Sequence, residues 1–325
     1  MNVSENVEVT SIDPLLIYAD LPLRRTYYPL GFGLEVATNS PEVIAAAGES
    51  WGDQRRAFDA APLEIRVVVQ PGGGQAAEPA FRAQRHLLGI VSDQANFALC
   101  DCDAEFAFCF TNSVTAANRP WFRWHFLEAM VYLLLTQRRL VPVHAACVER
   151  NGRGVLLCGR SGAGKSTLAF ACARAGWTYV ADDATMLLQE GGERVAIGNP
   201  RFVRFRKDAP EIFPELAGCD GHVRPNGKFT IEAETAALPG IRAASRSRIE
   251  KLAFLDRGKG PAEARRIAAS DAGERLLQEL PTYQEKVRAR HAGVVARLSQ
   301  VPAYELSYEA LPDAIEILQR ILEQS

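Results

Sequence analysis

The fold is decided by the stretch Gly159-Arg160-Ser161-Gly162-Ala163-Gly164-Lys165-Ser166-Thr167. It matches the pattern G-x-x-x-x-G-K-[ST] of phosphate-binding loops at every position. Glycines let successive backbone N–H groups turn inward around an anion, and the helix that follows points its positive end at the same place. We therefore expect the loop to bind a nucleoside triphosphate, with Lys165 at the β- and γ-phosphates and Ser166 at a Mg²⁺ ion.

The segments on either side of the loop favour the same interpretation. The apolar run Val155–Cys158 predicts a strand before it, and apolar residues at helical spacing predict a helix over 165–175 after it. Gly176 is placed to end that helix. Further upstream, Val141–Glu149 predicts another strand, and Asn151-Gly152 predicts a two-residue turn that pairs the two strands.

An aspartate pair, Asp182-Asp183, follows the next predicted strand, Thr178–Ala181. The carboxyl ends of parallel strands line the ligand crevice of a sheet. One carboxylate placed there can hold Mg²⁺, and the other can accept the proton of an attacking hydroxyl. The alternative for the pair is to cap the next turn. His144, on the strand before the loop, is either a hydrogen-bonded core histidine or a functional residue.

The composition is that of a globular protein without a strong charge bias. The 325 residues are 47% hydrophobic and carry a formal net charge of −2, which favours neither nucleic acid nor an anionic membrane as a partner. The seven cysteines form no zinc-ligand pattern and are expected to be reduced thiols of a cytoplasmic protein. The start, Met1–Asp13, is unlike a signal peptide, and the most apolar run, Phe126–Leu135, is shorter than the ~20 residues of a membrane span.

We expect two domains, one over residues 1–139 and the other over 140–325. In the first, strand-like runs and a helix that Pro120 opens predict a smaller α+β domain. The strand-like runs cover 63–69, 89–91 and 105–111, and the helix covers 121–137. By elimination, this N-terminal domain is assigned to acceptor recognition or assembly.

The second domain is expected to end in a helical tail. Before the tail, apolar runs over 186–188 and 195–197 predict a hairpin. Thr282–Glu285 predicts a capping box at the start of one helix. An amphipathic pattern predicts a final helix over 313–323.

Taken together, these motifs resemble the catalytic core of the HPr kinase/phosphorylase family. The residues that carry the resemblance are His144-Ala145-Ala146-Cys147, the stretch 154–167 with the phosphate loop, and 175–183 with the aspartate pair. The similarity is firm over about 142–184 and weaker toward the C-terminus. It implies an α/β fold with a P-loop core of the HPr-kinase/PEP-carboxykinase type, and ATP and Mg²⁺ as cofactors.

The resemblance also implies a role for each matching residue. Asp183 would act as the base for a serine hydroxyl, and His144 would be an active-site residue beside it. Lys165 and Ser166 would be the lysine and the serine of the phosphate loop, and Asp182 would be the carboxylate on the metal side. Oligomers, hexamers in particular, are common in that family, so the resemblance allows a homo-oligomer.

Two features of that family are missing from this chain. Its glutamate motif after the aspartates is absent, which leaves Asp208 or Glu211 as substitute metal carboxylates. Its basic loop is only approximated, and there Arg224 or Lys228 would stabilise the transferring phosphoryl group. The chain therefore resembles divergent relatives that phosphorylate a serine on small biosynthetic peptides, such as lasso-peptide precursors, more than regulators of HPr.

The leading hypothesis is an ATP- and Mg²⁺-dependent kinase that acts on a hydroxyl, expected to be a serine of a peptide or small protein. A small-molecule kinase on the same core would differ only in its acceptor. A nucleotide-dependent switch or binding module belongs to another class. A degenerate nucleotide binder is a further alternative, against which Lys165, Ser166 and the intact aspartate pair argue.

Overall fold

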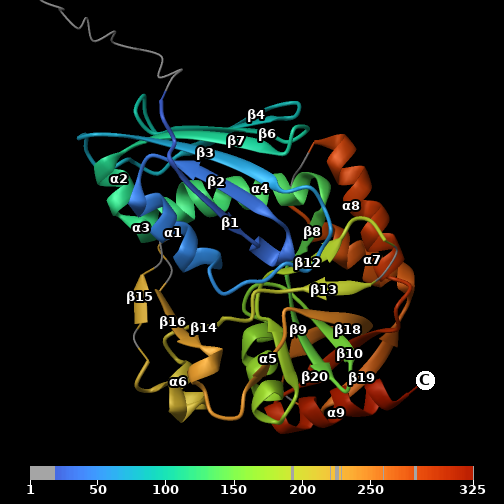
Figure 1. Cartoon of the computed structure of the whole chain (residues 1–325). Coiled ribbons are helices and arrows are strands. Elements are labelled where there is room, and N and C mark those ends of the chain that lie inside the picture. Colours follow the sequence, from blue (N-terminus) through green and yellow to red (C-terminus); the bar gives the residue numbers. More distant parts are fainter. Residues whose placement is uncertain are drawn as a thin grey trace, which may run out of the picture. The chain divides into compact units, whose positions relative to one another are not determined.

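The computed structural model describes residues 19–191, 194–219, 221–223, 227, 229–258, 260–281 and 284–324. The chain divides into two compact units, Met1–Met130 and Val131–Ser325 (Figure 1). The division lies within helix α4 (Glu128–Arg138), whereas the domain boundary expected from sequence follows this helix. The prediction made for Met1–Asp13 lies outside the described residues.

The first unit forms a mixed sheet with the strand order β1-β2-β3-β7-β6-β5-β4. Strands β2, β3 and β7 are parallel neighbours, and the remaining neighbours pair antiparallel. The strands expected over 63–69, 89–91 and 105–111 are confirmed as β3, β5 and β7. The bounds are β1 (Leu23–Tyr27), β2 (Leu34–Thr38), β3 (Leu63–Gln70), β4 (Ala80–Gln84), β5 (Leu87–Val91), β6 (Phe97–Asp101) and β7 (Phe106–Asn112).

Side-chain alternation along β7 gives this sheet two different faces. Ala107 and Cys109 are fully buried. Phe106, Phe108 and Phe110 alternate with them and are half-buried, and the ring of Phe108 contacts the other two. The helices of the unit run along one side of the sheet (Figure 1). Their bounds are α1 (Pro41–Trp51), α2 (Ser113–Ala117), α3 (Arg119–Phe122) and α4, with a π-helical turn over 123–127 between α3 and α4.

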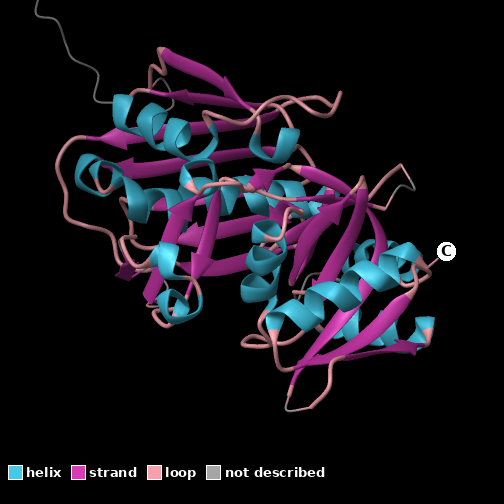
Figure 2. Cartoon of the chain, turned by 90° about the horizontal axis from the view of Figure 1, so that it is seen from below, coloured by secondary structure: helices cyan, strands magenta, loops and turns pink. Residues whose placement is uncertain are grey.

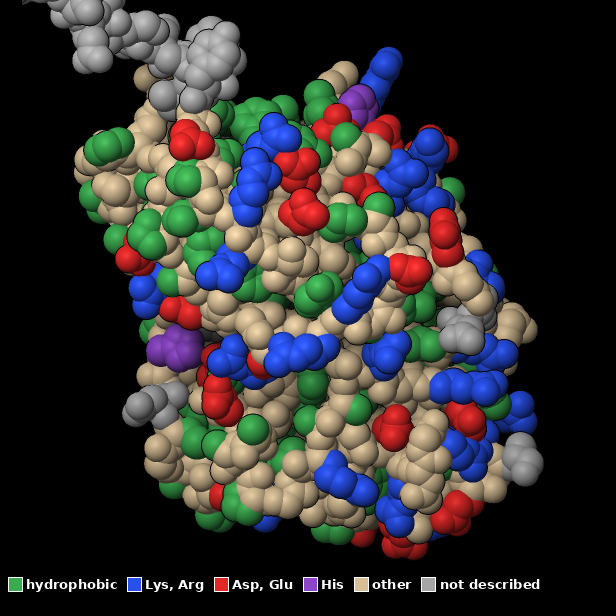
Figure 3. Space-filling model, in the orientation of Figure 1, with side chains coloured by type: hydrophobic (Ala, Val, Ile, Leu, Met, Phe, Trp, Pro, Cys, Tyr) green, Lys and Arg blue, Asp and Glu red, His purple; other side chains and the backbone are tan. Residues whose placement is uncertain are grey.

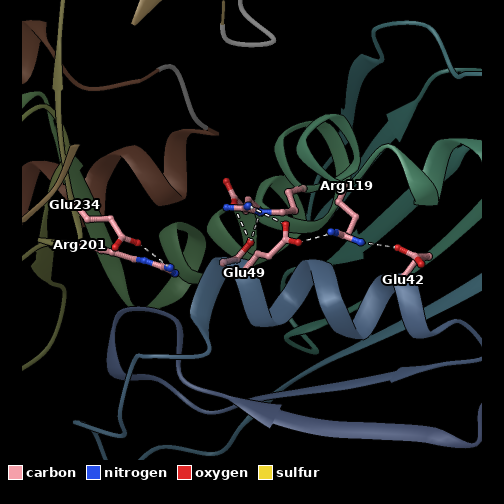
Figure 4. Close-up of polar contacts among 8 residues, drawn as sticks. Glu42, Glu49, Arg119, Arg201 and Glu234 are labelled. Carbon is pink, nitrogen blue, oxygen red and sulfur yellow. Dashed lines mark hydrogen bonds and ion pairs between the residues drawn. The ribbon is translucent and has the colours of Figure 1, made fainter. Parts of the chain in front are cut away.

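An ion-pair network joins α1 to α3 and the π-helical turn (Figure 4). Arg119 lies between Glu42 and Glu49, with N–O distances of 2.9 and 2.6 Å, and Arg123 reaches Glu49 and Glu128 at 3.2 and 3.1 Å. These side chains are partly exposed, and ion pairs in water add little to stability. Figure 4 also shows a pair in the second unit, Arg201 with Glu234.

The second unit is built on a larger sheet with the strand order β17-β11-β9-β10-β18-β13-β12-β8, to which β20 and β19 are added beside β18. Strand β9 runs antiparallel to both β10 and β11, and β10, β18 and β20 are parallel. The bounds are β8 (Leu140–Val143), β9 (Ala145–Arg150), β10 (Arg153–Cys158), β11 (Thr178–Ala181), β12 (Thr185–Leu188), β13 (Val195–Ile197), β17 (Arg242–Ala243), β18 (Arg246–Arg257), β19 (Glu263–Ile267) and β20 (Ala303–Tyr308).

Two apolar clusters cover the two faces of this sheet. One joins inward side chains of β9, β10 and β20 to α5 (Lys165–Arg174) and α9 (Leu311–Glu323). The other joins the opposite side chains to α7 (Ala269–Gln278) and α8 (Glu285–Leu298). Figure 2 shows the helices and strands of this layered arrangement from below. A small sheet of β14 (Phe202–Phe205), β16 (Phe229–Glu234) and β15 (Gly221–Val223) packs Phe205 against Phe170 of α5.

The local predictions around the glycine-rich loop are confirmed. Asn151 and Gly152 have φ angles of 54° and 77°, as a type I′ turn between paired strands requires, and they join β9 to β10. Helix α5 follows the loop, and Gly176 ends it with a φ of 87°. The N–H of Trp177 donates to the carbonyl oxygen of Cys172, which closes the helix end in a Schellman motif. The hairpin of β12 and β13 and the final helix α9 are likewise present.

Two predictions about the second unit are wrong. The single strand expected over Val141–Glu149 is interrupted at His144, because β8 pairs with β12 whereas β9 pairs with β10 and β11. The C-terminal tail is not purely helical, because β18, β19 and β20 extend the main sheet after residue 245. Thr282 of the expected capping box lies outside the described residues, and α8 begins at Glu285 directly after Gln284.

Gly198 carries the first testable prediction, because it packs against the end of β11. A Cβ at this position would collide with the carbonyl oxygen of Val180 and lie 2.9 Å from Cβ of Ala181. We expect Gly198→Ala to lower the free energy of unfolding by about 1–3 kcal/mol in chemical denaturation, because overpacking forces the backbone to shift. Gly218→Ala is the matched control, since a Cβ there meets nothing within 4 Å. Equal stability of the two variants would contradict the packing described for β11.

The surface carries charged side chains of both signs. Lys and Arg side chains and Asp and Glu side chains are interspersed on the face shown in Figure 3. Among the helices of the described residues, none is both long enough and apolar enough to cross a bilayer.

Candidate active site

The site lies at one edge of the main sheet, where three strand ends meet. Because β9 is antiparallel to both β10 and β11, the start of β9 lies beside the ends of the other two strands. Ala145 pairs with Cys158, and Cys147 pairs with Ala181. His144, the glycine-rich loop and Asp182-Asp183 therefore emerge at the same edge. The sequence predicted that the His144 strand pairs with the loop strand, but not that β9 lies between β10 and β11.

Glycines give the loop a backbone that other residues adopt rarely. Gly159, Gly162 and Gly164 have φ angles of 149°, 91° and 91°, and Gly164 is the residue directly before α5. Arg160, Ser161 and Gly162 are exposed, whereas Ala163, Ser166 and Thr167 are partly buried. A Cβ on Gly164 would lie 3.0 Å from the buried hydroxyl of Tyr308. The loop therefore packs closely against Tyr308 at Gly164, and its tip is exposed to solvent.

Lys165 is buried beneath the loop. Its Nζ donates to the carbonyl oxygens of Gly159 and Arg160 at 2.7 and 3.3 Å, and it lies 3.0 Å from Nε2 of His144. Burial lowers the pKa of Lys165, and the nearby carboxylates of Asp183 and Glu279 act against that lowering. A buried ammonium of this kind is stabilised by an anion, so Lys165 is suited to binding phosphate.

His144 stands between two carboxylates from distant parts of the chain. Its Nε2 lies 3.0 Å from Oδ1 of Asp183, and its Nδ1 lies 3.0 Å from Oε2 of Glu279. The ring is partly exposed, with 30% of its side-chain surface accessible. This contact set favours the functional interpretation of His144 over the core histidine that its strand position alone allowed.

Asp182 and Asp183 are adjacent but have different environments. Asp182 is buried, and its Oδ2 accepts a hydrogen bond of 3.0 Å from the backbone N–H of Arg204. Asp183 keeps 70% of its side-chain surface exposed. Burial raises the pKa of Asp182, although the positive charge of Arg204 opposes this effect. The pair therefore provides one buried and one accessible carboxylate.

Ser166 and Asp182 carry the kinds of oxygen atom that Mg²⁺ takes as ligands. The Ser166 hydroxyl donates to the backbone carbonyl oxygen of Asp182 at 3.3 Å, so this hydroxyl lies beside the backbone of the residue that carries the buried carboxylate. Mg²⁺ prefers oxygen ligands and is commonly held by one or two carboxylates together with substrate phosphates. A cation would also offset the burial of the Asp182 carboxylate. Among the described residues, no group of three or more His, Cys, Asp or Glu side chains is arranged to hold a metal without such a substrate.

The burial of Asp182 leads to a prediction about stability and pH. Because its pKa is raised on folding, the folded state binds more protons than the unfolded state above the ordinary carboxyl pKa of about 4, and stability falls as pH rises through this window. We expect Asp182→Asn to be more stable than the wild type at pH 7 without ligand, and the difference to vanish below about pH 4. Denaturant titrations at several pH values measure this.

The same variant should lose the stabilisation that ligand gives. With Mg²⁺ and ATP at 100 times the dissociation constant, the wild type should gain about 2.7 kcal/mol, and Asp182→Asn should gain much less. A wild type more stable than the variant at pH 7 without ligand would contradict the burial cost assigned to Asp182.

Several site residues were missed or are not joined to this edge. Glu279 directly follows α7 and was not predicted. A Cβ on Gly162 would lie 3.7 Å from Nη2 of Arg206, so this exposed guanidinium borders the loop tip. Asp208 and Glu211, the suggested substitutes for a metal carboxylate, are exposed, and within the described residues no contact joins them to Asp182. The suggested phosphoryl-stabilising residues, Arg224 and Lys228, lie outside the described residues.

A known family is similar to the part of the chain that carries most of the site residues. The family described as "SynChlorMet cassette protein ScmC" matches residues 108–208, under a third of the chain, which includes His144, the loop and the aspartate pair but not Glu279. No curated protein matches the chain.

Among the solved structures that match is the Hpr(Ser) kinase/phosphatase from Coxiella burnetii, at 13% identity and a TM-score of 0.29. The match covers 57% of this chain and 99% of that one.

Proposed function

We propose that this chain is a Mg²⁺-dependent kinase that transfers the γ-phosphoryl group of ATP to a hydroxyl, expected to be a serine of a peptide or small protein. The observation that carries the proposal is the meeting of Lys165, His144 and Asp183 at one sheet edge, with N–N and N–O distances of 3.0 Å to Nε2 of the histidine. A phosphate-binding lysine and an accessible carboxylate at this spacing can position two reactants together.

The loop and its lysine are assigned to the triphosphate. Backbone N–H groups of Gly159–Thr167 and the start of α5 favour negative charge. Lys165, which is buried and now donates to loop carbonyl oxygens, would exchange these for phosphate oxygens. Arg206 adds a positive charge beside the loop tip. Most of the catalytic effect would come from positioning and charge neutralisation.

Ser166 and Asp182 are assigned to Mg²⁺, on the chemistry of their oxygen atoms. When bound, the metal neutralises charge on the outer phosphates and helps to orient them. The backbone of Arg204 holds one carboxylate oxygen of Asp182, and Arg204 itself is paired with Glu232 through an N–O distance of 2.6 Å. These contacts fix the orientation of the buried Asp182 carboxylate.

Asp183 is assigned to the acceptor hydroxyl. Its carboxylate is exposed, so an acceptor can approach it, and the His144 ring fixes one of its oxygens. From this position Asp183 would accept the hydroxyl proton or orient the hydroxyl toward the γ-phosphate. The preference for a serine on a peptide rests on the resemblance to serine kinases of small biosynthetic peptides, and acceptor recognition or homo-oligomer assembly is assigned to the first unit.

Labelling with [γ-³²P]ATP and Mg²⁺ tests the proposal. The acceptors to offer are synthetic peptides and small proteins encoded beside the gene for this chain, each with a variant whose serines are replaced by alanine. We expect label in an acid-stable phosphate ester that disappears with the serine. Transfer to a small molecule instead of a peptide would assign the acceptor to the other kinase class. ATP hydrolysis that is independent of any acceptor would favour a nucleotide-dependent switch and overturn the proposal.

A further inference from the structure

Glu279 joins the site from a region of the sequence that none of the motifs includes. It directly follows α7, whose Ala272 and Leu276 pack on the sheet face opposite to α5. Its Oε2 lies 3.0 Å from Nδ1 of His144, across a sequence separation of 135 residues. Its negative charge also raises the pKa of Lys165, against the effect of burial. Two layers of the second unit, α5 and α7, therefore each bring a charged side chain to the same imidazole.

The two ring nitrogens of His144 face different partners. Nδ1 faces Glu279, and an ionised carboxylate can only accept hydrogen bonds, so the proton must lie on Nδ1. With the proton there, the neutral ring presents the lone pair of Nε2. An ammonium can only donate, so this lone pair accepts from Lys165 at 3.0 Å.

A proton on Nε2 would suit the other neighbour of that atom instead. Oδ1 of Asp183 also lies 3.0 Å from Nε2 and is an acceptor. The contacts of Nε2 with Lys165 and with Asp183 thus require different proton states of this one atom. The contact with Glu279 requires a proton on Nδ1 in both cases. Glu279 therefore leaves Nε2 as the ring atom at which a proton can be exchanged with the Asp183 side of the site.

We propose that Glu279 is a positioning residue for phosphoryl transfer, which holds the His144 ring with its proton on Nδ1 and its Nε2 directed at Asp183. This inference rests on the proposed function. Glu279 need not touch nucleotide or acceptor, because it acts through the histidine. Orientation of a histidine by a carboxylate on its other nitrogen is a general way to fix both the tautomer and the ring plane.

Glu279→Gln tests the proposal, because the glutamine amide has nearly the same shape but can either accept from Nδ1 or donate to it. The tautomer is measured from the ¹⁵N shifts of the imidazole in the full chain without ligand, with the His144 signal assigned from a His144→Asn variant. We expect the wild type to carry its proton on Nδ1 and Glu279→Gln to lose this preference. Glu279→Asp, which keeps the carboxylate, should restore part of it.

The kinetic result should separate positioning from binding. Transfer is measured with [γ-³²P]ATP, Mg²⁺ and the peptide that the wild type labels. If the wild type labels no peptide, ATP hydrolysis is measured instead. In either assay, kcat of Glu279→Gln should fall about 10- to 100-fold. The KM for ATP should change by no more than about threefold, because Glu279 contacts the histidine and acts on Lys165 only through its charge. Glu274→Gln, an exposed glutamate on the same helix α7, is the matched control and should behave as the wild type.

Two results would overturn the inference. One is a His144 ring whose nitrogen shifts are the same in the wild type and in Glu279→Gln. The other is a changed tautomer with an unchanged kcat, which would show that the contact exists but does not position the reaction. A wild type that turns over no ATP at all would instead overturn the proposed function, and the ¹⁵N shifts would still decide whether Glu279 fixes the ring.

Discussion

Lys165→Met should weaken the interaction with ATP and reduce kcat/KM by about 100- to 1,000-fold, the effect of removing one preorganised donor from a charged transition state. The methionine keeps much of the volume of the lysine stem but removes the ammonium that now lies 2.7 Å from the Gly159 carbonyl oxygen. ATP affinity from calorimetry and transfer from ³²P labelling measure the two effects separately. Because the buried ammonium costs desolvation, the unliganded variant should remain folded.

Lys251→Met is the matched control for this variant. Lys251 is also a buried lysine whose pKa is lowered by burial, but it lies on β18 and donates to the backbone carbonyl oxygen of Gln324. It should bind and transfer like the wild type, apart from any loss of stability. If Lys165→Met bound MgATP with wild-type affinity and transferred phosphate at the wild-type rate, the glycine-rich loop would not be the nucleotide site.

Asp183→Asn should strongly reduce transfer and leave ATP binding nearly intact. The asparagine has nearly the same shape, and its amide oxygen can still accept a hydrogen bond from the hydroxyl of the substrate. It cannot take up the hydroxyl proton, however, and it carries no charge. Loss of a general base typically costs about 100- to 10,000-fold in rate. We expect kcat to fall within that range and the dissociation constant for MgATP to change by no more than about threefold, because Asp183 lies beside the histidine and not under the loop.

Asp271→Asn is the control for the loss of a carboxylate charge away from the loop. Asp271 is an exposed carboxylate in the first turn of α7, at the opposite end of this helix from Glu279. Its neutralisation should leave transfer within about twofold of the wild type. Transfer by Asp183→Asn at close to the wild-type rate would show that another group handles the hydroxyl proton.

Local chemistry explains which parts of the fold were predictable. The Asn151-Gly152 turn, the loop glycines and the Gly176 helix end each require a backbone conformation that few residues adopt, so they mark their structure within a few residues. Strand β1, in contrast, is not identifiable in this way. Its sequence Leu23–Tyr27 is almost entirely exposed, so it lacks the apolar alternation from which half-buried strands are predicted.

Contacts between distant residues explain what was not predictable. The strand is interrupted at His144 because β8 pairs with β12 whereas β9 pairs with β10. The pattern of apolar residues continues through the break, so it does not mark this position. Glu279 meets His144 only because α7 packs on one sheet face while the histidine lies at the sheet edge. A glutamate at the end of a surface helix carries no signal of such a contact. The aspartate pair, by comparison, was predictable because it follows its strand directly.

The fate of the γ-phosphoryl group tests the central claim most directly. ATP carrying ¹⁸O in its γ-phosphoryl oxygens is incubated with Mg²⁺, the full chain and the candidate serine peptides, and the products are analysed by mass spectrometry. Our account predicts a phosphopeptide that carries the labelled oxygens, forms with the wild type and is absent with Asp183→Asn. Labelled oxygen found only in inorganic phosphate, at the same rate with and without every acceptor, would contradict it.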